Sequence, residues 1–153
     1  RQRHGREVAF SVSFRPILGA TEEDAWAKAE GIRSRARAQL EQSGGNVFPK
    51  AKPQSVGAQR LRDTVALGDR VDARLWTGLA ALVGGGHNST ALVGTAEQVA
   101  DALLDYYELG VTHFLVRGFD PLNDAVEYGR ELLPLTRAKV AERDARTDRG
   151  VRA

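Results

Sequence analysis

The chain has 153 residues, of which 42% are hydrophobic and 27% are charged. This length and composition predict one folded domain and exclude an intrinsically disordered chain. The formal net charge is only +2, from 22 basic and 20 acidic residues that are mixed along the chain, so no basic stripe indicates a nucleic-acid partner. The absence of cysteine excludes disulfides and cysteine-based metal sites, and the three histidines have no metal-ligand spacing, so no metal is expected.

No apolar run approaches the ~20 residues of a membrane span, and no N-terminal segment has the pattern of a signal peptide. We therefore predict a soluble cytoplasmic protein without a membrane partner. The chain also contains no methionine and begins with Arg1, which is too large for the usual removal of an initiator methionine. We accordingly expect these residues to be part of a longer protein.

The first half of the chain predicts one strand, one long helix and an irregular segment. Alternating apolar residues from position 8 predict a strand, and Pro16 should end its ladder near Arg15. Thr21-Glu22-Glu23-Asp24 resembles a capping box and predicts a helix that ends near Gln42. Residues 43–75 have no sustained period except for a short helix around 58–66, and so long a linkage is typical of a lid or mobile loop.

The second half predicts two more strands, each followed by a helix. A glycine-rich loop, 84–89, precedes the apolar run 90–94, which we interpret as a buried strand. Thr95-Ala96-Glu97-Gln98 is a second capping box, and its helix should stop at Gly110. Residues 111–118 predict a further strand, and Asp120-Pro121 predicts the start of a last helix that Pro134 kinks.

Strands that alternate with helices predict right-handed crossovers and a parallel sheet, so the expected fold class is α/β. Three parallel strands are too few to be covered on both faces, which again indicates part of a larger structure. Some strand side chains should then face a missing interior. The candidates are Val12, Phe14, Leu92, Val93, Phe114 and Val116.

Two features suggest a binding site. The three consecutive glycines of the 84–89 loop permit close backbone approach to a phosphate or a flavin edge, unless the loop is a plain connector, and His87 within it has the best claim to a ligand or proton-transfer role. Arg15 and Arg117 each come near the carboxyl end of a predicted strand, which is the ligand end of α/β sheets. Each of these arginines would there bind an anionic group or form a salt bridge.

Five segments, taken in order, resemble the C-terminal part of the luciferase-like flavin-dependent monooxygenases, in particular the alkanesulfonate monooxygenase-like branch. They are TEEDAW at 21–26, QSVGAQRL at 54–61, LWTG at 75–78, STALVGTAEQVA at 89–100, and LGV with GFDPL between 109 and 122. This resemblance implies a (β/α)8 TIM barrel. Residues 1–153 would form the last three strand–helix units, incomplete alone, with residues 43–75 as a mobile insertion.

The resemblance also implies an activity. Enzymes of this family use reduced FMN and oxygen to oxidise a small organic substrate, and a sulfonate is the substrate in the alkanesulfonate branch. The implied partners are the substrate, oxygen, a flavin reductase that supplies reduced flavin, and further copies of the chain in a homo-oligomer. A deazaflavin-dependent oxidoreductase and a non-catalytic half-barrel that acts by association are the alternatives.

The same resemblance assigns site residues one by one. Ser13 and Arg15 match strand positions at which the sulfonate enzymes carry an Arg and a His, so Arg15 is a catalytic candidate and Ser13 a substrate contact. His87, from the loop that replaces a family arginine, is the second catalytic candidate. The other assigned residues are Gly85, Gly86, Asn88 and Ser89 for the cofactor, and Arg117 and Phe119 for the substrate.

Overall fold

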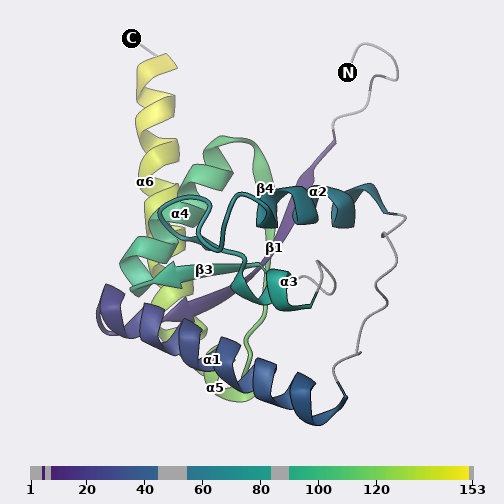
Figure 1. Cartoon of the computed structure of the whole chain (residues 1–153). Coiled ribbons are helices and arrows are strands. Elements are labelled where there is room, and N and C mark those ends of the chain that lie inside the picture. The colour runs from purple at the N-terminus through teal and green to yellow at the C-terminus, as the bar shows by residue number, and fades with distance from the viewer. Residues whose placement is uncertain (1–4, 6–7, 45–54, 84–89, 152–153) are drawn as a thin grey trace.

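The computed structural model describes residues 5, 8–44, 55–83 and 90–151 (Figure 1). Strands and helices alternate as expected, and none of the helices in this part of the chain is long and apolar enough to cross a membrane. The elements are β1 (Phe10–Leu18), α1 (Glu22–Gln42), α2 (Val56–Val65), β2 (Leu75–Trp76), α3 (Gly78–Leu82), β3 (Ala91–Gly94), α4 (Ala96–Glu108), β4 (Val111–Val116), α5 (Pro121–Glu127), the π-helical turn η1 (Tyr128–Leu132) and α6 (Leu133–Val151).

The helix starts follow the capping residues in the sequence. The Thr21 side chain accepts a hydrogen bond from the Asp24 N–H at the start of α1, and the Asp120 carboxylate does the same for Asn123 at the start of α5. At α4 both bonds of the capping box are present, between Thr95 and Gln98. These local bonds satisfy donors that the first helical turn would otherwise leave unpaired, which is why the predicted starts are confirmed.

The four strands form one sheet in the order β2-β3-β1-β4. β1 pairs in parallel with both β3 and β4, whereas the two-residue β2 pairs antiparallel with β3. The expectation of three strands, all parallel, was therefore incomplete. β2 escaped prediction because two residues, Leu75 and Trp76, are too short to show a period.

This strand order differs from the consecutive order of a barrel, in which β3 would lie between β1 and β4. Here the chain passes from β1 through α1 to β3 on one side, and then through α4 to β4 on the other side of β1. Right-handed crossovers that run in opposite directions along a sheet lie on opposite faces. The described sheet is accordingly covered by helices on both faces, in the manner of an open doubly wound sheet.

Two apolar clusters show this double cover. On one face Phe14 and Leu92 pack with residues of α4, η1 and α6, and on the other Ile17 and Val93 pack with residues of α1, β2 and α3. The expectation that Phe14, Leu92 and Val93 face a missing interior is therefore wrong, since each is at most 4% exposed. α4 crosses over β1 and covers the sheet face that a barrel would turn inward.

Pro16 does not end β1, contrary to expectation, because its missing N–H falls where no ladder bond is needed. The N–H groups of Arg15 and Gly19 donate toward β3, so the alternate residues, including Pro16, face β4. β4 ends at Val116, before it could accept a bond from position 16. The Pro16 carbonyl in turn accepts a hydrogen bond from the Tyr128 hydroxyl at 2.5 Å.

The last helix contains the irregularity that Pro134 predicts. Proline has no N–H for the bond to residue 130, and its ring crowds that carbonyl. The chain responds with the five-residue π turn η1 just before Leu133, rather than with a break. The turn lies next to Tyr128, which is only 4% exposed.

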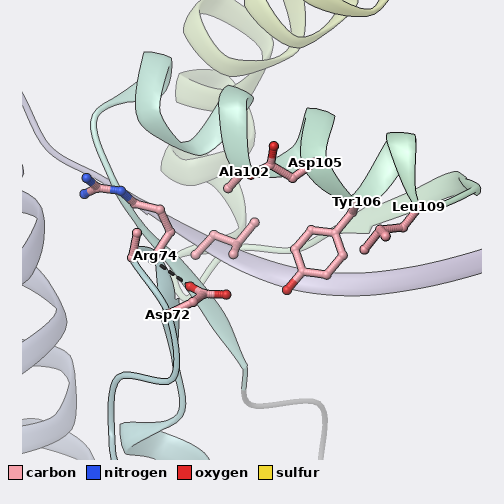
Figure 2. A pocket seen from close by; sticks show the side chains of 8 residues that line it. Asp72, Arg74, Ala102, Asp105, Tyr106 and Leu109 are labelled. Carbon is pink, nitrogen blue, oxygen red and sulfur yellow. Dashed lines mark hydrogen bonds between the residues drawn. The ribbon is translucent and has the colours of Figure 1, made fainter.

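A polar junction built on Glu22 connects α1, α4 and the turn before β2. The Glu22 carboxylate forms an ion pair with Arg74 at 3.0 Å and accepts hydrogen bonds from Gln98 at 2.9 Å and Trp26 at 3.3 Å. Arg74 also donates to the Gln98 side-chain oxygen at 3.1 Å. The turn before β2, at residues 72–74, forms one wall of a cavity against α4 (Figure 2).

We expect this junction to make stability depend on pH. Hydrogen bonds from Arg74, Gln98 and Trp26 lower the pKa of Glu22 from 4.5 to about 2. Because the folded-state pKa is below the unfolded value, the contribution of Glu22 is fully present above about pH 4.5 and is lost as the pH falls towards 2. Glu22→Gln should lower the thermal midpoint at pH 7, and the difference from wild type should shrink over this window. Glu23→Gln, in the same helical turn, is the matched control, and an equal loss in both variants would contradict the role of the junction.

Candidate functional site

Arg15 and Phe119 meet although they are 104 positions apart in the sequence. The Arg15 Nη1 donates a hydrogen bond of 2.6 Å to the Gly118 carbonyl, and its guanidinium carbon lies 5.1 Å from the centre of the Phe119 ring. This is a cation–π arrangement, which holds the charged group over the aromatic face. Two residues assigned to the site from the sequence are thus brought into contact.

The pairing of β1 with β4 brings in the other two described candidates. Ser13 is the register partner of Leu115, and the N–H of Arg117 donates to the Phe14 carbonyl. Since side chains alternate along a strand and partners in register share a face, Ser13, Arg15, Leu115 and Arg117 lie on the same face of the sheet. Ser13 and Arg15 are half-buried there, and Arg117 is exposed. Arg15 lies three residues before the end of β1, not at its end as expected.

The electrostatics of this cluster favour an anion. Burial lowers the pKa of Arg15, and the positive charge of Arg117 lowers it further. A group with a negative charge that contacts both guanidinium groups would relieve this repulsion. Guanidinium groups bind carboxylate, sulfonate and phosphate oxygens through paired N–H donors.

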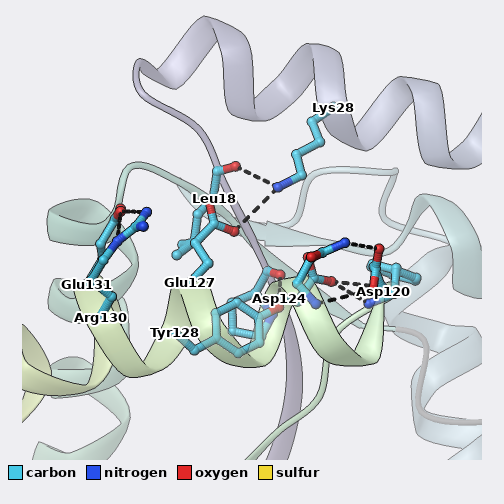
Figure 3. A network of polar contacts seen from close by, with 11 residues as sticks. Leu18, Lys28, Asp120, Asp124, Glu127, Tyr128, Arg130 and Glu131 are labelled. Atoms are coloured by element: carbon cyan, nitrogen blue, oxygen red, sulfur yellow. Dashed lines mark hydrogen bonds and ion pairs between the residues drawn. The ribbon is translucent and has the colours of Figure 1, made fainter.

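The loop that carries Phe119 is fixed by Asp124 (Figure 3). The Asp124 Oδ2 accepts hydrogen bonds from the backbone N–H of Phe119 at 2.7 Å and of Asp120 at 3.0 Å. A Cβ atom at Gly118 would lie 2.3 Å from the Asp124 side chain, so this close approach requires glycine. The position of the Phe119 ring under Arg15 therefore depends on the Gly118–Asp124 pair.

Lys28 and Tyr128 hold the carboxyl end of β1, and no sequence pattern indicated a role for either residue. The Lys28 Nζ donates to the Leu18 carbonyl at 3.3 Å and lies 3.5 Å from the Glu127 carboxylate (Figure 3). Burial, followed by the charges of Asp124 and Glu127, raises the pKa of Tyr128, so its hydroxyl remains a donor. Both residues bond to backbone carbonyls, and such contacts leave no pattern in a sequence.

The glycine-rich loop lies outside the described residues. The assignments of His87 as a catalytic residue and of Gly85, Gly86, Asn88 and Ser89 as cofactor contacts therefore stay predictions. The same holds for the part of the expected mobile insertion at positions 45–54. The rest of that insertion includes α2, which confirms the short helix expected there.

The described residues fit an anionic group and do not enclose a flavin ring. Three of the cavities that they form have volumes of about 280, 320 and 330 Å³. These volumes are close to the lower limit for ligand pockets, roughly 300–1,000 Å³. The three cavities are open to solvent, however, whereas a ligand pocket buries most of the surface of its ligand. Phe119 lines the second of these cavities, beside Arg15. The cluster could hold the phosphate of a cofactor or the acid group of a substrate.

One comparison with known proteins bears on this site. The family model described as luciferase-like monooxygenase matches residues 1–113, which is more than half of the chain. The matched region runs from the N-terminus through β1, α1, β3 and α4 into β4. It contains Ser13 and Arg15, and it ends before Arg117 and Phe119.

Proposed function

The chain belongs to the luciferase-like monooxygenase family, and from this membership we propose that it serves a flavin-dependent monooxygenase reaction on a small organic substrate with an acidic group. Reduced FMN is the proposed cofactor, oxygen is the co-substrate, and a sulfonate is one candidate substrate. The family match supports the reaction class. The proximity of the two positive charges of Arg15 and Arg117, with Phe119 beside Arg15, supports a substrate that carries an acidic group.

The contribution of the described residues is to bind and orient. Arg15 is held by the Gly118 carbonyl and by the Phe119 ring, so its guanidinium is positioned before a substrate arrives. Arg117 is exposed at the same edge and would close on the other side of the acid group. We assign Ser13 to the same face as an additional substrate contact.

The remaining parts of the proposal come from the family resemblance. We propose a flavin reductase as the source of reduced flavin, a homo-oligomer as the working form, and the cytoplasm as the location. Residues 43–75 would act as a lid over the site. The barrel implied by the resemblance would place β4 beside β3, and the described strand order differs from it.

The experiment uses the protein as the cell makes it, supplied with FMN, a flavin reductase and oxygen. A panel of alkanesulfonates and matched primary alcohols of equal chain length is assayed for sulfite release and for oxygen uptake above the reductase background. Catalase is present, so that oxygen consumed by free reduced flavin is half returned from hydrogen peroxide and only oxygenation of a substrate raises the uptake. We expect uptake that depends on the protein and on the acidic substrate. Flavin binding without substrate-dependent uptake, or equal turnover of the alcohols, would contradict the proposal.

The same assay separates the proposed activity from its deazaflavin alternative. A monooxygenase consumes oxygen in proportion to product. A deazaflavin-dependent oxidoreductase moves a hydride and leaves oxygen uptake at the background. Reduction of a deazaflavin cofactor without oxygen uptake would therefore replace the proposed function with the alternative.

A further inference from the structure

The cavity against α4 lies on the opposite face of the sheet from the Arg15 cluster (Figure 2). Its volume is about 280 Å³. The apolar part of its wall comes from Ala73, Leu92, Ala102 and Leu109, and its polar part from Asp72, Arg74, Asp105 and Tyr106. An engineered apolar cavity of ~150 Å³ holds benzene, so this space can take an aromatic ring with a short side chain.

The floor of the cavity is buried and its rim is exposed. Leu92 is 1% exposed and lies at the bottom of the cavity, whereas Leu109 is 80% exposed and lies at its mouth. The Tyr106 ring packs on Phe14 with a centroid separation of 4.9 Å. No hydrogen-bond partner of the Tyr106 hydroxyl is found among the described residues, and Figure 2 shows this hydroxyl on the side of Asp72.

The charge at this rim is negative. One oxygen of the Asp72 carboxylate accepts hydrogen bonds from the N–H groups of Arg74 and Leu75, and no cationic side chain forms an ion pair with this carboxylate among the described residues. The Arg74 guanidinium extends away from Tyr106 and is paired with Glu22 (Figure 2). Burial raises the pKa of Tyr106, and the charges of Asp72 and Asp105 raise it further, so the hydroxyl keeps its proton.

We propose that this cavity binds a small aromatic amine, with the ring against Leu92, Ala102 and Leu109 and the ammonium group between Asp72 and Tyr106. Apolar walls select the ring, and the unbalanced carboxylate selects a cation over a neutral or anionic head group. The face of Tyr106 adds a cation–π contact. This site is separate from the Arg15 cluster, which selects anions.

The test titrates the full chain with 2-phenylethylamine, 2-phenylethanol and 3-phenylpropionate, and follows backbone amide signals by NMR. We expect the amine to shift the signals of Leu92, Ala102 and Leu109 and to bind about fivefold more tightly than the alcohol, as an ion pair near the surface would give. The propionate should bind more weakly still. This comparison on the unchanged protein does not depend on the folding of any variant.

Asp72→Asn removes the charge and keeps the oxygen that accepts from Arg74 and Leu75, so the turn should be preserved. It should weaken amine binding about fivefold and leave alcohol binding unchanged. Glu41→Gln, which removes a carboxylate from the far end of α1, is the matched control and should change neither. Equal affinities for the three probes, signal shifts confined to other residues, or equal effects of Asp72→Asn and Glu41→Gln would overturn the proposal.

Discussion

Replacing Trp76 by alanine will lower the free energy of unfolding by about 3–5 kcal/mol, the range for removal of a buried large aromatic side chain. Trp76 is 1% exposed, and its ring packs against Gly78, where a Cβ atom would lie 2.5 Å from it. It belongs to the same cluster as Ile17, Ala29 and Val93. For a domain of this length the change corresponds to a fall in the thermal midpoint of about 6–20 °C.

Leu67→Ala is the control, because the Leu67 side chain is 76% exposed and its removal should change stability by no more than about 0.5 kcal/mol. Chemical denaturation followed by far-ultraviolet circular dichroism gives both values. A Trp76→Ala variant whose stability falls by less than 1 kcal/mol would show that β2 does not belong to the core. The short antiparallel strand would then not be part of the working fold.

Arg15→Gln will lower kcat/KM for an acidic substrate by at least about tenfold, because a hydrogen bond to a charged group contributes roughly 1.5–3 kcal/mol. The glutamine side chain is too short to replace the Arg15 Nη1 donor, but the loop that carries Phe119 should be retained because Asp124 still accepts from the N–H groups of Phe119 and Asp120. The loss should appear mainly in KM, since the proposed role of Arg15 is to bind and orient. The measurement is the coupled oxygen-uptake assay, with an alkanesulfonate as substrate.

Two variants control for general effects of lost charge. Arg117→Gln, at the exposed side of the same cluster, should raise KM by a smaller factor than Arg15→Gln. Arg137→Gln, exposed on α6, should leave the kinetics unchanged. If Arg15→Gln and Arg137→Gln behave alike, the cluster does not bind the substrate.

The sequence was sufficient where structure depends on neighbouring residues. The capping bonds at Thr95 and Asp120 lie within three positions of the residues that receive them, so the starts of α4 and α5 could be predicted. Pro134 predicted a local irregularity in the last helix, although the expected form was a kink and the structure has a π turn. Arg117 could also be placed correctly, because it directly follows the end of β4, whereas Arg15 was placed at the end of a strand that continues to Leu18.

The sequence was insufficient where structure depends on which strands pair. Whether β4 lies beside β1 or beside β3 is decided by contacts more than 90 positions apart, such as Ser13 with Leu115. The extension of β1 past Pro16 depends on where β4 ends and on the distant Tyr128 hydroxyl. No local pattern records such long-range choices, which is why the strand order and the double cover of the sheet were not predicted.

The pairing of β1 with β4 underlies the whole site, since it brings Arg15 to Phe119 and Arg117. It can be tested with Ser13→Cys combined with Leu115→Cys, in a chain that has no other cysteine. Neighbouring strands lie about 4.8 Å apart and strands two apart about 9.6 Å, whereas a disulfide needs Cα atoms roughly 4.4–6.8 Å apart. We predict that mild oxidation converts the double variant to an intramolecular disulfide, while each single variant stays reduced or forms only intermolecular dimers. A double variant that stays reduced under conditions in which both thiols react with a small alkylating reagent would contradict the pairing, and with it the site.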